Sequence, residues 1–173
     1  ERAEALFGEA YDIFKRYKNR RGMAFALNNL GGVMFLLGNV VGAQEKFFKG
    51  YQLHREVGDL TGTAHSLSAL GNGALSEGNY EDAHQYYKEA LTIRRNLGNQ
   101  RGIADSLIDL ASVEMNTGNG QKAEEYVDEA LAIQERIGDK QGLTMSKVLK
   151  ALAFLYREDY TMAEQYVVES LGL

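Results

Sequence analysis

A glycine followed by asparagine or aspartate returns every twenty residues along most of this chain. The pairs are Gly38-Asn39, Gly58-Asp59, Gly78-Asn79, Gly98-Asn99, Gly118-Asn119 and Gly138-Asp139. Glycine readily takes the left-handed conformation that ends many helices. Asn or Asp can accept hydrogen bonds from the free N–H groups that begin the next helix. Each pair therefore predicts one helix end and one helix start.

The segments between these pairs have the composition of helices. They are rich in Ala, Leu, Glu, Lys and Tyr, their apolar residues fall at helical spacing, and the chain contains no proline. The sequence therefore predicts about nine antiparallel helices. Gly120, one residue past its predicted cap, does not fit this scheme.

The side-chain pattern repeats at forty residues, so two kinds of helix alternate. Small residues hold one register at Ala3, Ala43, Ala83, Ala123 and Ala163, and another at Ala10, Gly50, Ala90, Ala130 and Ser170. These two registers share a face and let a neighbouring helix approach closely. A recurring glycine lies just inside the other kind of helix, at Gly22, Gly62, Gly102 and Gly142. We expect a close approach to the backbone there, to a group that the sequence does not identify.

The forty-residue unit resembles a tetratricopeptide repeat, whose signature joins an L-G pair in a first helix to A-x-x-x-F in a second. The matching residues are Leu27, Leu30, Gly31, Met34, Ala43 and Phe47 in one copy, Leu67, Leu70, Gly71, Ala74, Ala83 and Tyr87 in the next, and Leu107, Leu110, Ala111, Glu114, Ala123 and Val127 in the third. A fourth copy keeps Ala151, Phe154, Ala163 and Val167 but has Lys147 and Lys150 where leucines are expected. The resemblance implies an all-α right-handed superhelix. It covers the chain as a single domain, with a half repeat at 1–18 and repeats at 19–58, 59–98, 99–138 and 139–173.

The repeat departs from the usual pattern, which is about 34 residues long and ends in proline. It is more similar to the long-repeat type found in kinesin light chains, G-protein-signalling modulators and the sensor arms of bacterial STAND-type ATPase regulators. The stretches "LGNQRG" and "IGDKQG" resemble the bacterial group most. Because the chain starts at Glu1 inside a helical pattern, we expect a fragment of a longer protein.

Charge, cysteine content and hydropathy indicate which classes of partner and location to expect. A formal net charge of −5 and a pI near 5.3 argue against a nucleic-acid-binding surface. The one basic run, at 15–21, is interpreted as a solvated helix end. The absence of cysteine fits a reducing compartment, so we expect a cytoplasmic protein. No apolar stretch is long enough to predict a membrane span.

No pattern in the sequence predicts catalysis, a cofactor or a metal site. His54, His65 and His84 fall on different predicted helices without a ligand-type partner one turn away, and are interpreted as surface or groove residues. "GNGALSEG" at 71–78 lacks the third glycine and the preceding strand of a phosphate-binding loop. Runs of carboxylates such as "KAEEYVDEA" are interpreted as solvated helix faces. We therefore expect a non-catalytic protein.

One stripe in the first helix of each repeat changes identity between copies, as residues that meet a ligand are free to do. It contains Phe25, Asn28, Gly32 and Phe35, then His65, Ser68, Asn72 and Leu75, then Asp105, Ile108, Ser112 and Met115, and finally Met145, Val148, Leu152 and Leu155. Asn29 and Asp109 lie beside it and are included in the predicted site. The family resemblance places this stripe on the concave face.

The stripe's chemistry favours a particular kind of partner. Its fourth copy is entirely apolar, while Asp105 and Asp109 give the middle an acidic character. It carries no Lys or Arg, so it lacks the cations of a clamp for a terminal carboxylate. The sequence predicts a groove for a peptide or helix, with apolar anchors near Val148 and Leu152 and a basic residue near the two aspartates.

Three functions are compatible with these observations. The first is a protein–protein interaction scaffold that binds a peptide or helix in its concave groove. The second is a ligand-sensing arm of a bacterial signal-transduction ATPase or transcription regulator. The third is a module that self-associates through open terminal helices, because the array begins and ends in mid-pattern. The sequence leaves open whether a small molecule, rather than a peptide, occupies the groove.

Overall fold

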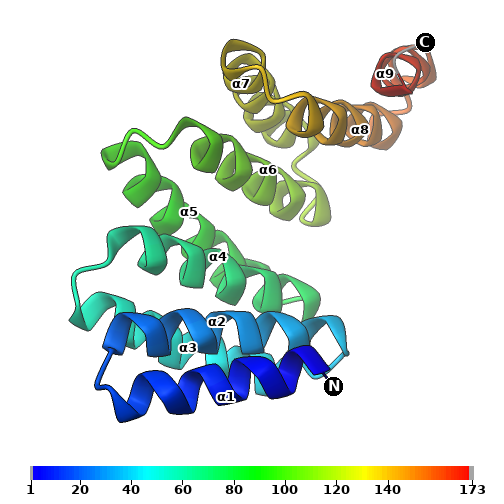
Figure 1. Cartoon of the computed structure of the whole chain (residues 1–173). Coiled ribbons are helices and arrows are strands. Elements are labelled where there is room, and N and C mark those ends of the chain that lie inside the picture. The colour runs from blue at the N-terminus through cyan, green and yellow to red at the C-terminus, as the bar shows by residue number, and fades with distance from the viewer. Residues whose placement is uncertain (1, 172–173) are drawn as a thin grey trace. The chain divides into compact units, whose positions relative to one another are not determined.

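The computed structural model of the chain describes residues 2–171, and within them it is all-α without a strand. This confirms the fold class expected from the sequence. The helices alternate between the two predicted kinds and have these bounds: α1 Arg2–Arg16, α2 Arg20–Leu36, α3 Val40–Glu56, α4 Leu60–Ser76, α5 Tyr80–Asn96, α6 Gln100–Asn116, α7 Gly120–Ile137, α8 Lys140–Tyr156 and α9 Tyr160–Leu171 (Figure 1).

The helix breaks lie at the Gly-Asn and Gly-Asp pairs, as predicted. All six glycines have positive φ, for example +66° at Gly98. The following Asn or Asp often caps the next helix. The side chain of Asp59 accepts from the N–H of Gly62 at 3.0 Å, and Asn39 and Asn99 cap their helices in the same way. Asn119 makes no such cap bond, and α7 starts at Gly120.

The twenty-residue ladder of left-handed residues extends further than the glycines. Lys18 has φ +54° and Glu158 has φ +60°, and each lies one period beyond the terminal Gly-Asn or Gly-Asp pair. A side chain on a left-handed residue costs about 1–2 kcal/mol, because Cβ approaches the following carbonyl oxygen. These two breaks are therefore made by residues that disfavour the conformation they adopt.

The chain forms two compact units that divide between Ile93 and Arg94, within α5. In the first unit, α1 packs on α2, α2 on α3 and α3 on α4, and α2 also contacts α4. In the second unit, α6 packs on α7, α7 on α8 and α8 on α9, and α6 also contacts α8. The helices of the first kind, α2 and α4 in one unit and α6 and α8 in the other, therefore lie next to each other.

The small-residue registers lie in the core where helices cross. Ala43, Ala83, Ala123 and Ala163 are all buried, whereas Ala3 in the first helix is exposed. In the first unit, Ala43 packs with Phe47 and Leu70. In the second unit, Ala123 packs with Ala111 and Val127. The residues that define the repeat are thus the ones that hold successive helices together.

The two lysines that replace leucines in the fourth copy keep charged partners. Lys150 is buried and forms an ion pair with Asp128, and its ammonium lies 4.9 Å from the centre of the Tyr166 ring. Burial opposes its charge, but the hydrogen bonds to Asp128 and Tyr166 raise the pKa of Lys150 above its usual value. Lys147 pairs with Glu169 at 3.4 Å. The change from leucine is accommodated by acidic residues on α7 and α9.

Equivalent break positions should respond in opposite directions to substitution. Gly98→Ala should lower the free energy of unfolding by about 1 kcal/mol, because alanine resists positive φ, and Glu158→Gly should raise it by a similar amount. Urea denaturation followed by circular dichroism measures both changes.

The matched control is Gly120→Ala. Gly120 is helical, and an added Cβ would make only an ordinary contact, 3.8 Å from Arg157 Cγ. That variant should be neutral or slightly stabilised. Equal effects of alanine at Gly98 and Gly120 would contradict the role given to the left-handed residues.

Candidate binding site

The glycines that recur inside the first kind of helix make room for one side chain of the preceding helix. Gly22, Gly62, Gly102 and Gly142 lie under the residue eight positions earlier, which is Phe14, His54, Arg94 and Gln134 in turn. A Cβ on Gly62 would lie 2.1 Å from His54 Nδ1, and one on Gly22 would lie 2.4 Å from the Phe14 ring. The close approach expected from the sequence is therefore to a side chain whose chemistry changes in every copy.

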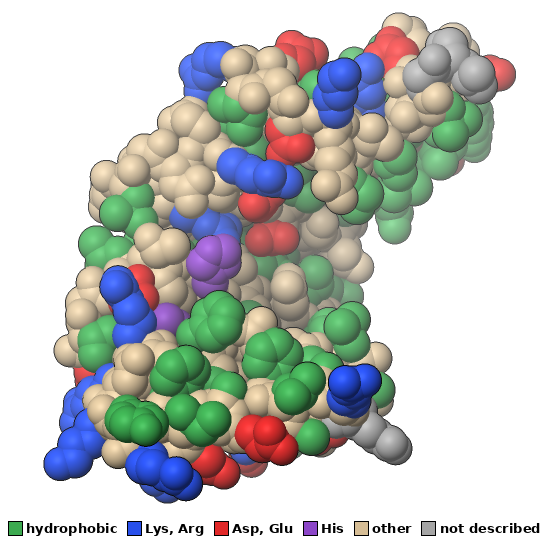
Figure 2. All heavy atoms as spheres, in the orientation of Figure 1, with side chains coloured by type: hydrophobic (Ala, Val, Ile, Leu, Met, Phe, Trp, Pro, Cys, Tyr) green, Lys and Arg blue, Asp and Glu red, His purple; other side chains and the backbone are tan. Residues whose placement is uncertain are grey.

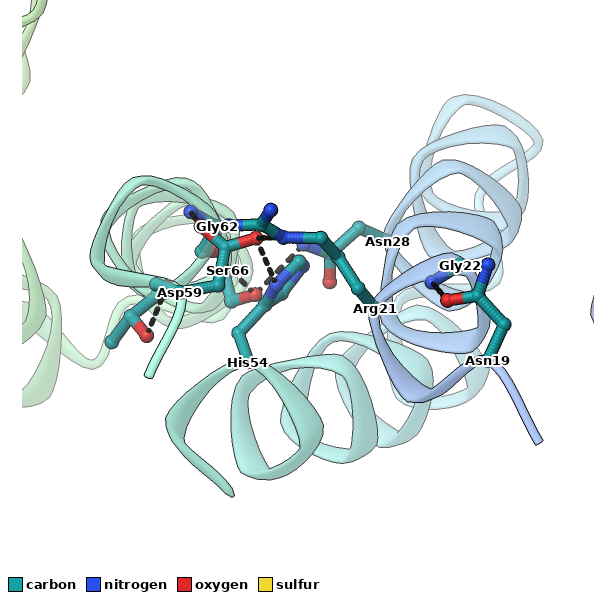
Figure 3. Close-up of polar contacts among 9 residues, drawn as sticks. Asn19, Arg21, Gly22, Asn28, His54, Asp59, Gly62 and Ser66 are labelled. Atoms are coloured by element: carbon teal, nitrogen blue, oxygen red, sulfur yellow. Dashed lines mark hydrogen bonds and ion pairs between the residues drawn. The ribbon is translucent and has the colours of Figure 1, made fainter. Parts of the chain in front are cut away.

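A pocket of about 660 Å³ lies above two of these contacts in the first unit, bordered by α2 and α4. Phe14 and Phe25 supply aromatic walls, and Asn28, Asn29 and His65 are among its other lining residues. In Figure 3 the His54 ring projects from α3 toward the start of α4, and Arg21 reaches across from α2 to Asp59. This arrangement brings four residues of the predicted site into one cavity, of which three, Phe25, Asn28 and His65, belong to the stripe.

Asp59 holds the charged groups of this first pocket together. Its Oδ2 lies 2.7 Å from Arg21 Nε and 3.2 Å from His54 Nδ1. The hydrogen bond from Arg21 is the main reason that the pKa of Asp59 falls from 3.8 to about 2. Burial lowers the pKa of His54, and Asp59 opposes this only in part. The pocket therefore contains a persistent carboxylate that already has a cationic partner.

His54 lines the pocket and is not on the open surface, which agrees with the groove position of the two, surface or groove, that the sequence left open. It is 5% exposed because it fills the space over Gly62, although its ring lines the pocket. Asn28 Nδ2 donates to Ser66 Oγ at 2.7 Å, and this serine donates in turn to the carbonyl oxygen of Gly62 at 3.0 Å. The polar groups beneath the first pocket are thus joined across α2 and α4.

A second pocket, of about 350 Å³, occupies the equivalent place in the second unit, bordered by α6 and α8. Its lining follows from the first by a shift of eighty residues, which is two repeats. The shift takes Arg21 to Arg101, Phe25 to Asp105, Asn28 to Ile108, Asn29 to Asp109, His54 to Gln134, Asp59 to Asp139 and His65 to Met145. The fold thus repeats the cavity while the sequence changes its chemistry.

The second pocket is acidic. Arg101 Nε lies 3.4 Å from Asp139 Oδ2, which repeats the Arg21–Asp59 pair at a longer distance. Asp105 and Asp109 act on the buried guanidinium of Arg94; burial lowers the pKa of Arg94, and these two carboxylates oppose that shift. Arg94 also donates to Ser106 Oγ. Two carboxylates therefore share one buried cation at the edge of the pocket.

The remaining stripe residues of the first unit have mixed surroundings. Phe35 packs against the core cluster of Ala43, Phe47 and Leu70. Asn72 is exposed, and its Oδ1 accepts from the Tyr87 hydroxyl at 2.7 Å. Ser68 and Leu75 are half-buried, and a Cβ on Gly32 would meet open space. Phe35 is thus also a packing residue.

The second unit carries the rest of the stripe. Ile108 and Met115 pack partly against Ala111, Ala123 and Val127, and the Ser112 hydroxyl donates to the carbonyl oxygen of Ile108 at 3.0 Å. The fourth copy is exposed, from 41% at Val148 and Leu152 to 66% at Met145, with Leu155 between these values. Apolar side chains are visible along α8 and α9, and also over α1 and α2, in Figure 2.

Most of the polar residues beneath the two cavities were not predicted from the sequence, and His54 was expected only as a surface or groove residue. Arg21, His54 and Asp59 belong to the first pocket, and Arg101, Gln134 and Ser146 to the second. A signal for part of this set was present, because His54 and Gln134 stand eight residues before a recurrent glycine. Across residues 2–171, no group of three or more His, Asp or Glu side chains could hold a metal ion.

Comparison with known proteins places this arrangement in a family. The sequence profile described as Tetratricopeptide repeat matches residues 22–96 and 102–173. The chain therefore belongs to the tetratricopeptide repeat family, as its sequence pattern indicated. None of the curated proteins compared with it matches this sequence. No helix among the described residues is long and apolar enough to cross a membrane.

Solved structures show the same fold at low sequence identity. BtubC (BKLC) from P. vanneervenii has a TM-score of 0.86 at 19% identity, over 98% of this chain and 70% of that one. The TPR-like repeats of a putative kinesin light chain from Podospora anserina give 0.77 at 15% identity, over 98% and 84%. A Rap protein complexed with competence and sporulation factor gives 0.87 at 14% identity, over 98% of this chain and 48% of that one.

The Arg21–Asp59 pair should make stability depend on pH. Because the pKa of Asp59 is lowered in the folded state, its contribution is fully present above about pH 4 and is lost as the pH falls toward 2. Arg21→Gln removes the main cause of the lowered pKa. The loss of unfolding free energy between about pH 5 and pH 3 should therefore be smaller in Arg21→Gln than in the parent.

Arg20→Gln provides the control for this prediction. Arg20 is the adjacent residue and pairs with Glu56 on the surface, with both side chains more than half exposed. Its replacement should leave the acid-dependent loss of stability unchanged, because exposed pairs contribute little. Indistinguishable pH profiles for the two variants would argue against the role of Asp59.

Proposed function

We propose that this chain is a non-catalytic protein-binding module, and that a peptide or helix of its partner lies along the variable stripe of the first-kind helices. The observation that carries this proposal is the exposed apolar surface of Met145 and Leu152 on α8, next to a pocket lined by Asp105 and Asp109. Exposed apolar side chains beside fixed charges are typical of interaction surfaces. Apolar anchors and one basic residue in the partner would complement them.

The family and the similar solved structures support a protein-binding function as a class. Tetratricopeptide repeat proteins are generally non-catalytic scaffolds. The Rap protein above is a complex with competence and sporulation factor, so a protein of this fold holds a partner molecule. For the present chain, the partner's chemistry is inferred from its own side chains.

Repeat equivalence separates the stripe into two kinds of position. Val148 corresponds to Asn28, which bonds to Ser66 on the adjacent first-kind helix, and Leu155 corresponds to Phe35 and Met115, which pack in the core. Leu152 corresponds to Gly32, where a Cβ would meet open space. We therefore infer that Leu152 contacts the partner, whereas Val148 and Leu155 are also suited to pack against another helix.

This division favours self-association as a second candidate function. A helix from a second molecule that packs on Val148 and Leu155 would bury apolar surface that is now exposed. Val148→Asp should then reduce any concentration-dependent increase in sedimentation coefficient. An unchanged profile would leave peptide binding as the better explanation of this surface.

The direct test of the proposed function uses peptides selected from a random library on the immobilised chain. Leu152→Asp and Asp109→Lys should each weaken binding of a selected peptide by about tenfold or more in fluorescence anisotropy. Circular dichroism establishes that each variant retains its helices.

Two control variants carry the same changes away from the stripe. Leu36→Asp replaces an exposed leucine at the end of α2, and Glu89→Lys reverses an exposed charge on α5. Both should bind the peptide as the parent does. If Leu152→Asp and Asp109→Lys also bind as the parent does, the stripe is not the binding surface.

A further inference from the structure

Two buried oxygens beneath the second pocket accept no hydrogen bond from residues 2–171. Gln134 is 2% exposed and Ser146 is fully buried, and both line the pocket between α6 and α8. Among the residues that the structure describes, neither Gln134 Oε1 nor Ser146 Oγ has a hydrogen-bond partner. Because buried polar atoms in folded proteins are nearly always paired, these two atoms indicate a group that donates from within the cavity.

Comparison between repeats shows which donor is missing. Ser66 accepts from Asn28 Nδ2 at 2.7 Å, and Ser106 accepts from Arg94 Nη1. Ser146 is the next copy of the same position. The residue equivalent to Asn28 there is Ile108, whose side chain has no donor. The structure thus retains the acceptor of an inter-helix bond while the sequence replaces its donor.

The walls of the second pocket suit a cation on an apolar stem. Asp105 and Asp109 line it and together face one buried cation, Arg94, while Arg101, which also lines the pocket, lies beside Asp139. Ile108 and Met145 supply apolar surface to the same pocket. The carboxylates, the apolar side chains and the two buried oxygens therefore line one cavity.

We propose that the second pocket binds the guanidinium group of an arginine side chain of the partner. This inference rests on the proposed function and assigns the partner's basic residue to a site. Guanidinium offers five N–H donors in a plane, whereas ammonium offers three around one nitrogen. It can therefore bond Asp105 or Asp109 and also reach Gln134 Oε1 and Ser146 Oγ, while its hydrocarbon stem contacts Ile108 and Met145.

The first pocket serves as an internal contrast. Its equivalent positions hold Phe25, Asn29 and His54 in place of Asp105, Asp109 and Gln134. Its Ser66 is already bonded to Asn28 Nδ2, although Asn28 Oδ1 is buried without a hydrogen-bond partner among the described residues. A cation would find there aromatic walls and a single carboxylate, Asp59, in place of the three carboxylates that line the second pocket. Arginine binding should therefore be confined to the second pocket.

The test titrates the isotope-labelled chain with N-acetyl-arginine amide and follows amide chemical shifts by nuclear magnetic resonance. Saturable shifts should appear at the Gln134 side-chain amide and at the backbone amides of Gly142 and Ser146. N-acetyl-citrulline amide has the same shape without the charge, and should bind about tenfold more weakly or not at all. N-acetyl-lysine amide should bind at least about threefold more weakly than the arginine probe.

The most specific test variant copies a residue from an equivalent position in another repeat. Ile108→Asn reproduces the residue that bonds Ser66 in the first unit, so it should satisfy Ser146 from within the protein and weaken the arginine probe about fivefold or more. Asp109→Asn should weaken binding of the arginine probe by a similar factor, because it replaces a carboxylate with a neutral amide of nearly the same size. Glu89→Gln, an exposed charge on α5, is the control and should change nothing.

The outcomes separate this inference from the proposed function. Equal binding of arginine and citrulline probes, equal binding of arginine and lysine probes, or unchanged affinity in Ile108→Asn would overturn the guanidinium site. If the arginine site fails while Leu152→Asp still abolishes peptide binding, only this inference is wrong. If arginine binds as expected but neither Leu152→Asp nor Asp109→Lys weakens peptide binding, the guanidinium site is supported and the proposed peptide-binding stripe is wrong.

Discussion

The left-handed residue that ends each helix is the constraint on which the rest of this structure depends. It recurs every twenty residues from Lys18 to Glu158, and so fixes where each helix ends and the next begins. Because the period is constant, equivalent side chains of alternate helices meet equivalent neighbours. The alanine contacts at the crossings and the two pockets eighty residues apart both follow from this regular spacing.

Most of the fold could be predicted because the break positions carry glycine, whose freedom at positive φ is visible in a sequence. The positive φ of Lys18 and Glu158 could not be predicted, since neither residue type indicates this conformation, although the repeat period placed a boundary after residue 18. The packing of alanines was likewise predictable from their spacing. The function of Gly62 was only half visible: the sequence indicated a close approach, but only the structure identifies His54 as the side chain concerned.

The candidate site was predicted less completely, for a physical reason. Variation between repeats marks positions that are not needed for every inter-helix contact, but it does not separate solvent-facing residues from those that pack differently in each copy. Phe35 and Met115 vary and yet lie against the core. Gln134 and Ser146 lie beneath a pocket but come from a buried surface, where a search for variable exposed residues does not look.

The glycine that lies beneath one side chain of the preceding helix allows that side chain to differ from repeat to repeat. Because glycine leaves space without dictating what fills it, the four copies hold a phenyl ring, an imidazole, the hydrocarbon part of an arginine and a carboxamide in the same place. Hydrophobicity, charge and hydrogen-bonding capacity can thus be exchanged at a single position per repeat while the helix crossings stay as they are. A protein built in this way can diversify its ligands by altering pocket floors, with its backbone left unchanged.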